Sequence, residues 1–162
     1  MPLPQLIEED LRILDGALAT LVTRSESSMA MLIDQAGFLI TQAGESSQVD
    51  TTTLAALAAG SFAATQSMAA LTHETNFNSV YQQGDSSSLL ILSVDENTLV
   101  VVLFKTHISV GAVKYYARGT VAQVGEQLKK ARERDPANTI DLATLNLEDS
   151  VAFFHRKSVD VN

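Results

Sequence analysis

The sequence has no cysteine and little charge, and each shortage removes a class of function. Without cysteine the chain cannot form a disulfide, offers no thiolate nucleophile and has no cysteine ligand for zinc. Charged residues make up only 19% of the chain and the formal net charge is −8, so the basic footprint of a nucleic-acid-binding protein is missing. The same negative charge disfavours binding to an anionic membrane surface.

Signals for export or membrane insertion are not recognisable either. Residues 1–14 have neither the basic flank nor the apolar core of a secretory signal. The longest uncharged run, residues 51–73, is rich in alanine, threonine and serine, and we interpret it as too mildly apolar for a membrane span. We therefore expect a cytoplasmic protein without a membrane span.

Residues that could support catalysis or ligand binding do not form a known constellation. The three histidines, His73, His107 and His155, include no pair with the spacing of a helical metal site. No glycine-rich phosphate loop is present, and Ser86–Ser88 have no plausible base nearby in the sequence. We expect no metal, no cofactor and no catalytic residue, and hence a protein that is not itself an enzyme.

Hydrophobic periodicity predicts one α/β (α+β) domain over residues 1–136, followed by a tail over 137–162. Apolar residues at helical spacing predict helices over 4–23, 51–72 and 109–134. Short apolar runs bounded by turn residues predict strands over 29–33, 38–41, 80–82, 89–94 and 99–105. Gly37 is expected to take a positive φ in the hairpin between the first two strands. The unbroken apolar run 99–104 is typical of a central strand that is covered on both faces.

The helix over 51–72 is the most informative element, because no acidic or basic residue lies between Asp50 and Glu74. At 100° per residue, one side of this helix carries large apolar residues that we assign to the domain's own sheet: Leu54, Leu57, Met68 and Leu71. The opposite side carries small residues: Ala56, Ala59, Gly60, Ala63, Ser67 and Ala70. An ordinary surface helix would place charge there. Small residues allow another backbone to approach closely, so we expect this side to pack against a second copy or another protein; the alternative is burial inside one domain.

A short strand and the tail give two further indications of partners. Val80, Tyr81 and Gln82 form an uncharged strand that is suited to pairing across a dimer, the alternative being a capped edge. The tail carries apolar residues among acidic ones, and we expect four of them to dock on a partner protein or back on the protein's own dimer: Leu145, Leu147, Phe153 and Phe154. A disordered end is the alternative.

The order of elements, taken with these segments, resembles the Roadblock/dynein light chain superfamily, and most closely its bacterial MglB-like branch. The resemblance extends from Met29 to Tyr116. It rests on MLIDQAGFLITQAG, VDTTTLAALAAGSFAATQSMAAL, SSLLILSVDENTLVVVLF and ISVGAVKYYAR. It implies an α-β-β-α-β-β-β-α sandwich with a five-stranded, mostly antiparallel sheet. It also implies a homodimer in which two sheets join edge to edge into ten strands, with the second helices paired.

The resemblance further implies a function and the residues that perform it. MglB-like proteins bind a Ras-like small GTPase of the MglA type, stimulate its GTP hydrolysis, and act in cell polarity and motility. By resemblance Ala63 and Ser67 face that GTPase, and Ala56 and Ala59 extend the contact. We assign the dimer interface to Gly60, Ala64, Val80, Tyr81 and Gln82. No arginine finger is implied, because family members reposition the GTPase's own residues.

Two other classes of function remain open from the sequence. One is a noncatalytic scaffold or polarity protein of the same fold that does not stimulate hydrolysis, since a fold alone does not define function. The other is a small-molecule sensor of the PAS or GAF type, which would need an enclosed apolar pocket with a few polar groups. As a regulator or a scaffold the protein is expected in the cytoplasm, with the cell pole as an expected location.

Overall fold

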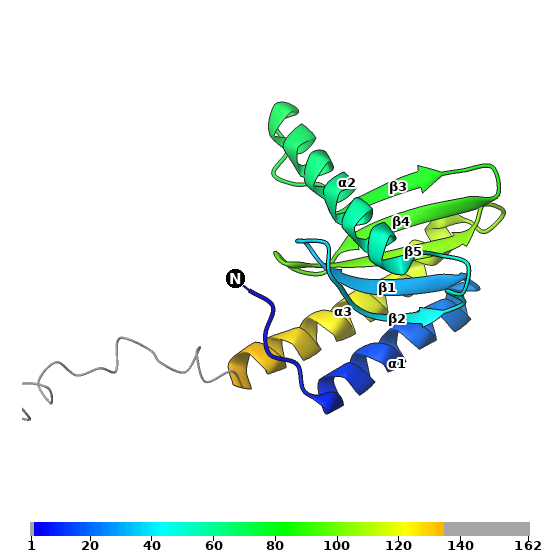
Figure 1. Ribbon diagram of the computed structural model, residues 1–162. Helices are drawn as coiled ribbons and strands as arrows, with labels where there is room; N and C mark the ends of the chain where they lie inside the picture. The colour runs from blue at the N-terminus through cyan, green and yellow to red at the C-terminus, as the bar shows by residue number, and fades with distance from the viewer. Residues whose placement is uncertain (1, 135–162) are drawn as a thin grey trace, which may run out of the picture.

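The computed structural model describes residues 2–134, which form three helices and five strands in the predicted order (Figure 1). The elements are α1 (Glu8–Ser25), β1 (Met29–Asp34), β2 (Leu39–Gly44), α2 (Thr51–Leu71), β3 (Ser79–Gln83), β4 (Ser87–Ser93), β5 (Thr98–Lys105) and α3 (Val110–Arg134). The predicted docking residues of the tail, Leu145, Leu147, Phe153 and Phe154, lie outside the described residues.

The five strands form one open sheet in the order β2-β1-β5-β4-β3. All four pairings are antiparallel, so the sheet is fully rather than mostly antiparallel. The central strand β5 pairs with β1 on one side and β4 on the other, and Val101 stands opposite both Met31 and Ile91. The prediction that residues 80–82 belong to an edge strand is confirmed, because β3 pairs with β4 alone.

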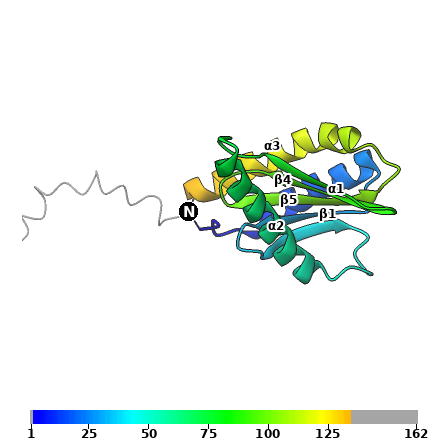
Figure 2. The ribbon, with the colours of Figure 1, turned by 90° about the horizontal axis from the view of Figure 1, so that it is seen from above.

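Helices cover both faces of the sheet, with α1 and α3 on one face and α2 on the other (Figure 2). Successive side chains of β5 point to opposite faces of the sheet, so this strand contributes to the hydrophobic core on each face. Val100 and Val102 pack under α1 and α3 with Leu14, Leu18 and Leu128. Leu99 and Val101 pack on the other face under α2. Burial on both faces explains the unbroken apolar run of β5, as predicted.

The hairpin between β1 and β2 positions the start of α2. Gly37 has a φ of +99°, which confirms the prediction and suits a residue without a side chain. The Asp34 carboxylate accepts a hydrogen bond from the Phe38 amide at 2.9 Å and closes the turn. A Cβ atom on Gly37 would lie 3.0 Å from the Cα of Ala56. The turn therefore approaches the first turns of α2 closely and fixes that end of the helix.

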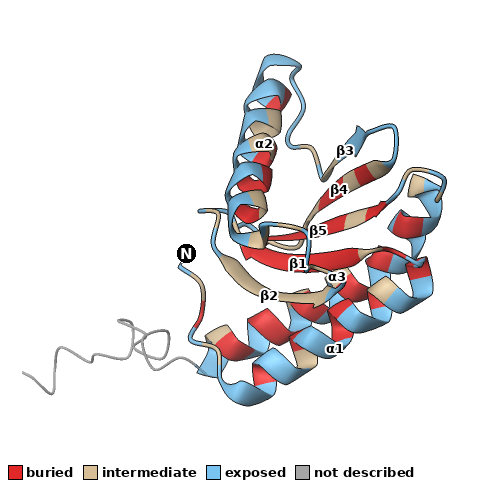
Figure 3. Ribbon diagram, turned by 45° about the vertical axis from the view of Figure 1, so that its right-hand side comes forward, coloured by how far each residue is buried: buried red, intermediate tan, exposed pale blue. Residues whose placement is uncertain are grey.

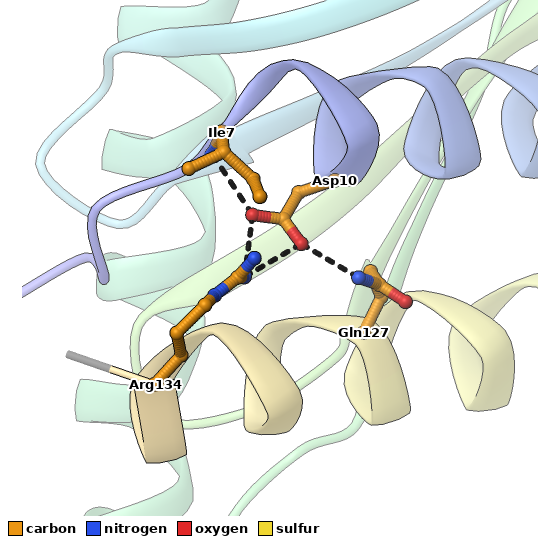
Figure 4. Close-up of polar contacts among 4 residues, drawn as sticks. All are labelled: Ile7, Asp10, Gln127 and Arg134. Carbon is orange, nitrogen blue, oxygen red and sulfur yellow. Dashed lines mark hydrogen bonds and ion pairs between the residues drawn. The ribbon is translucent and has the colours of Figure 1, made fainter.

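A buried acidic residue ties the start of α1 to the end of α3 (Figure 4). Asp10 is 1% exposed. Its carboxylate accepts hydrogen bonds from the Ile7 amide at 2.9 Å, the Gln127 side chain at 2.6 Å and Arg134 at 2.7 and 2.8 Å. Burial alone would raise the pKa of Asp10, but the hydrogen bonds from Arg134, Ile7 and Gln127, together with the charge of Arg134, hold it below the ordinary value.

Asp10→Ala is expected to lower the free energy of unfolding at neutral pH by about 2–3 kcal/mol, because charged, buried hydrogen bonds of this kind are lost. Urea denaturation followed by circular dichroism measures the change. Since the folded pKa lies below the unfolded one, the contribution of Asp10 is complete above the unfolded pKa of about 3.9 and is lost as pH falls through the folded pKa. The gap between wild type and variant should therefore shrink on acidification from pH 5 towards about pH 2.

Glu9→Ala is the matched control for this variant. Glu9 occupies the same helical turn, but its ion pair with Arg12 is exposed and 3.9 Å long. Exposed pairs of this kind contribute about 0–1 kcal/mol. Equal destabilisation by the two substitutions would contradict a special role for the buried carboxylate.

Candidate protein-docking surface on α2 and β3

Helix α2 rests on the sheet by a narrow stripe and leaves most of its surface open. Its first turn is capped by Asp50, whose carboxylate accepts hydrogen bonds from the Thr53 amide at 3.0 Å and hydroxyl at 2.6 Å. Only five of its 21 residues are buried: Ala55, Ala58, Ala59, Phe62 and Ala69. The last turns project beyond the β3 side of the sheet (Figure 1). A helix that contacts its own domain so sparingly has room for a partner on its outer side.

Three large apolar residues of α2 point away from the sheet, against the prediction that they face it. Leu57 is 66% exposed, Met68 54% and Leu71 82%. Leu54, the fourth residue assigned to the sheet, does pack at its edge. The strands already supply the bulky side chains of this core, including Met31, Ile33 and Leu99. The helix fits above them through alanines and Phe62, and its other large residues are exposed. Figure 3 shows buried and exposed positions alternating along the ribbon of α2.

The predicted partner residues divide between the two sides of α2. Ala59 is 5% exposed and belongs to the core under the helix, so its assignment to the partner contact is corrected. Its burial follows from its position one residue after Ala58 and three before Phe62, on the stripe that meets the sheet. Ala56, Ala63 and Ser67 are exposed, as are Gly60 and Ala64.

The outer side of α2 carries two parallel stripes. The small-residue stripe consists of Ala56, Ala63, Ser67 and Ala70, and the large apolar stripe consists of Leu57, Ala64, Met68 and Leu71. Gly60 lies between them. The Ser67 hydroxyl donates a hydrogen bond to the Ala63 carbonyl at 3.2 Å. Because that hydroxyl already has a hydrogen-bond partner within the helix, a partner protein can cover the small-residue stripe without burying an unpaired hydroxyl.

The edge strand β3 adjoins the large apolar stripe. Val80 packs against the core under α2, and Tyr81 stacks on Phe104 with 6.3 Å between ring centres. The Gln82 side chain donates a hydrogen bond at 3.0 Å to Ser61, which lies on α2 between Leu57 and Ala64. Neither β3 nor α2 has a charged residue. We call the large apolar stripe and β3 together the edge surface.

A side-chain amide holds the projecting half of α2 in place. Gln66 donates a hydrogen bond to the Phe77 carbonyl at 2.5 Å and accepts one from the Phe77 amide at 3.3 Å. These two bonds link the helix to the segment that leads into β3. The outer side of α2 is therefore a positioned surface, suited to docking with limited rearrangement.

The exposed groups on α2 and β3 are apolar, hydroxyl and amide side chains, with no charged residue among them. In residues 2–134 no cluster of three or more histidine, aspartate or glutamate side chains could hold a metal ion. The large exposed residues that the sequence interpretation missed, Leu57, Met68 and Leu71, extend the apolar surface. One signal could have indicated the exposure of Leu57: it lies five residues from Phe62, about 140° around the helix, and so falls outside a narrow apolar stripe centred on Phe62.

By length and composition α2 is apolar enough to cross a membrane, with a mean hydropathy of 1.4. This differs from the prediction that residues 51–73 are too mildly apolar for a membrane span. In the fold, however, α2 covers Met31 and Ile33 of the sheet, which would be exposed without it. We interpret its hydropathy as that of a helix with one side in the core and the other available to a protein.

Comparisons with known proteins agree on the family. The Roadblock/LC7 domain model matches residues 17–104, which is more than half of the chain. The fold is similar to that of Myxococcus xanthus MglB, with a TM-score of 0.73 and 27% identity, covering 78% of this chain and 96% of that one. It is also similar to a gliding protein, MglB, from Thermus thermophilus, with a TM-score of 0.74 and 25% identity, covering 80% and 98%.

A third solved structure, described as MglB with a tetrameric arrangement, has a TM-score of 0.75 and 25% identity, with 81% of this chain and 98% of that one covered. None of the curated proteins matches the chain at a significant level.

Proposed function

This chain belongs to the Roadblock/LC7 domain family, and on that basis we propose that it is an MglB-like, noncatalytic regulator of a Ras-like GTPase. In this proposal it works as a homodimer, binds an MglA-type GTPase in the cytoplasm and stimulates its hydrolysis of GTP, in the service of cell polarity or motility. The observation that supports it most directly is the exposed, uncharged small-residue stripe of α2.

The dimer in this proposal forms through the edge surface. Pairing of β3 with its copy would satisfy the open side of that strand and join two five-stranded sheets into one of ten strands. The same two-fold arrangement would bring two copies of α2 together, so that Leu57, Met68 and Leu71 leave water. Gly60 and Ala64 would let the two helices approach closely. One similar solved structure is described as MglB with a tetrameric arrangement, which supports self-association in general.

The small-residue stripe is the proposed contact for the GTPase. Ala56, Ala63 and Ser67 offer a shallow surface on which the backbone of a partner loop can lie. The five arginines in residues 2–134 are all on α1 or α3, on the opposite face of the sheet. In this proposal the chain stimulates hydrolysis by preferring the GTPase conformation in which the GTPase's own residues orient the attacking water.

The test is GTP hydrolysis by the MglA-type GTPase of the same organism, measured with and without a molar excess of this protein. We expect acceleration of about tenfold or more, below the roughly 10³–10⁵-fold that an arginine finger supplies. Isothermal titration calorimetry on the same pair separates binding from stimulation. Binding without acceleration would support the scaffold alternative. The absence of both would overturn the proposal.

A further inference from the structure

A groove lies on the face of the sheet opposite α2, between α3 and the ends of β3 and β4. It is open to solvent and has a volume of about 350 Å³. Leu92, Ala117 and Val121 supply apolar surface, while Lys114 and Arg118 line it from α3. The groove exists because α3 packs over the middle of the sheet and leaves the end of the edge strand β3, at Ser79, uncovered.

The groove has positive charge in a chain whose formal net charge is −8. No acidic residue lines it. At the other end of α3, Arg132 and Arg134 are engaged in ion pairs with Asp95 and Asp10, both at 2.7 Å. Among residues 2–134, neither Lys114 nor Arg118 is in an ion pair. An apolar floor beside two cations is suited to an apolar segment that carries carboxylates.

The sequence after α3 has that composition. Residues 141–154 include Asp141, Glu148 and Asp149 and no lysine, arginine or histidine. The same segment contains five large apolar residues before its final phenylalanine: Leu142, Leu145, Leu147, Val151 and Phe153. We propose that this acidic apolar segment of the chain's own tail docks in the groove between α3 and the β3–β4 ends.

The distances allow the docking within one protomer. Ala122, at the near end of the groove, is 12 residues before Arg134, or about 18 Å along the helix axis. Residues 135–141 can span up to about 23–25 Å when extended. Asp141 therefore reaches the groove, and the residues after it can run back towards Lys114. A short link of this length gives an effective concentration on the order of millimolar, so even a weak contact is populated.

This docking does not depend on the proposed GTPase regulation. The groove and the small-residue stripe lie on opposite faces of the sheet, so a docked tail leaves the stripe of Ala56, Ala63 and Ser67 uncovered. The sequence left two docking sites open for the tail, the partner or the protein itself. The composition of the groove favours docking on the protein itself.

The absence of cysteine makes a direct test possible. Ser150→Cys places a single nitroxide label in the tail of the otherwise unchanged full chain. The measured quantity is the ratio of amide NMR signals with the label oxidised and reduced. We expect the signals of residues 114–122 and of Ser79 and Ser93 to lose most of their intensity. Signals of α2 should be unaffected, and the label should broaden groove signals at any protein concentration.

Two charge variants decide the cause of the contact. Lys114→Glu with Arg118→Glu should restore the groove signals, because the acidic segment then meets like charge. Lys129→Glu with Lys130→Glu is the matched control: both lysines are exposed on the same helix but do not line the groove. The control should leave the broadening intact. Because all four side chains are exposed, the variants are expected to fold, and the spectra themselves report it.

A second variant tests the apolar part of the contact. Leu145→Ser with Phe153→Ser keeps every charge and should also abolish the broadening. Two results for the chain labelled at Ser150→Cys would overturn the proposal. One is broadening of the α2 signals, and the other is broadening of the tail signals alone. A sample that mixes isotope-labelled chain without nitroxide and unlabelled chain with it reports contacts between molecules. Strong groove broadening in that sample as well would also overturn it, since the tail would then dock on a neighbour.

Discussion

An Ala63→Arg variant is expected to lose detectable binding to the MglA-type GTPase while remaining a folded dimer. Ala63 lies in the middle of the small-residue stripe, exposed, with no acidic residue on α2 to pair with a new cation. Burial of an unpaired charge in a packed interface costs about 3–5 kcal/mol, which weakens affinity by roughly a hundredfold or more. Because Ala63 is exposed in the isolated domain, the arginine does not disturb the fold. Calorimetric titration and GTP hydrolysis measure the two effects.

Ala112→Arg is the matched control for that variant. Ala112 is also exposed, but it lies on α3, across the sheet from the small-residue stripe. The same change in size and charge at that site should leave binding and stimulation unchanged. Normal binding by Ala63→Arg would show that the GTPase docks elsewhere. Equal losses in both variants would indicate a general electrostatic effect and not a contact.

The fold was accessible from the sequence because its local and global signals agree. The hairpin needs a positive φ at Gly37, and the glycine at the end of the turn 34–37 predicts it. The unbroken apolar run of β5 predicts a strand covered on both faces, and the single helix α2 on one side with two helices on the other provides that cover. The resemblance to a known family then selected one topology among those that this order of elements allows.

The candidate site was only partly accessible, because a helical wheel gives relative angles and not the side that faces the sheet. Large apolar residues normally point inward, and that rule placed Leu57, Met68 and Leu71 on the wrong side. Small residues such as Ala55 and Ala58 face the sheet because the strands beneath them already fill the core with bulky side chains. That packing is visible only in the fold. The same error placed Ala59 outside.

Contacts between distant parts of the chain could not be predicted at all. Asp10 and Arg134 are 124 residues apart in sequence, and nothing in either neighbourhood indicates that they meet. The groove beside Lys114 and Arg118 likewise depends on where α3 crosses β4, which is a property of packing. Both features nevertheless use residues that composition alone would assign to a solvated helical face.

An Ala64→Glu variant is expected to convert the dimer into a monomer. Ala64 lies in the large apolar stripe, flanked on the helix by Leu57 and Met68. A two-fold interface places the same patch on both copies, so one substitution introduces two carboxylates into the same contact. The desolvation of each and the repulsion between them oppose association. Light scattering after gel filtration should give the 17.4 kDa mass of one chain instead of twice that value.

Ala112→Glu, on α3, is the control and should leave the mass of the dimer unchanged. An unchanged dimer in Ala64→Glu would instead place the interface outside the edge surface, with the other edge strand β2 as the next segment to test. The Ala63 and Ala64 variants differ by one position on the helix, yet they are expected to separate docking from assembly. If Ala63→Arg remains a dimer but loses GTPase stimulation, while Ala64→Glu loses the dimer, the two stripes of α2 bind different partners.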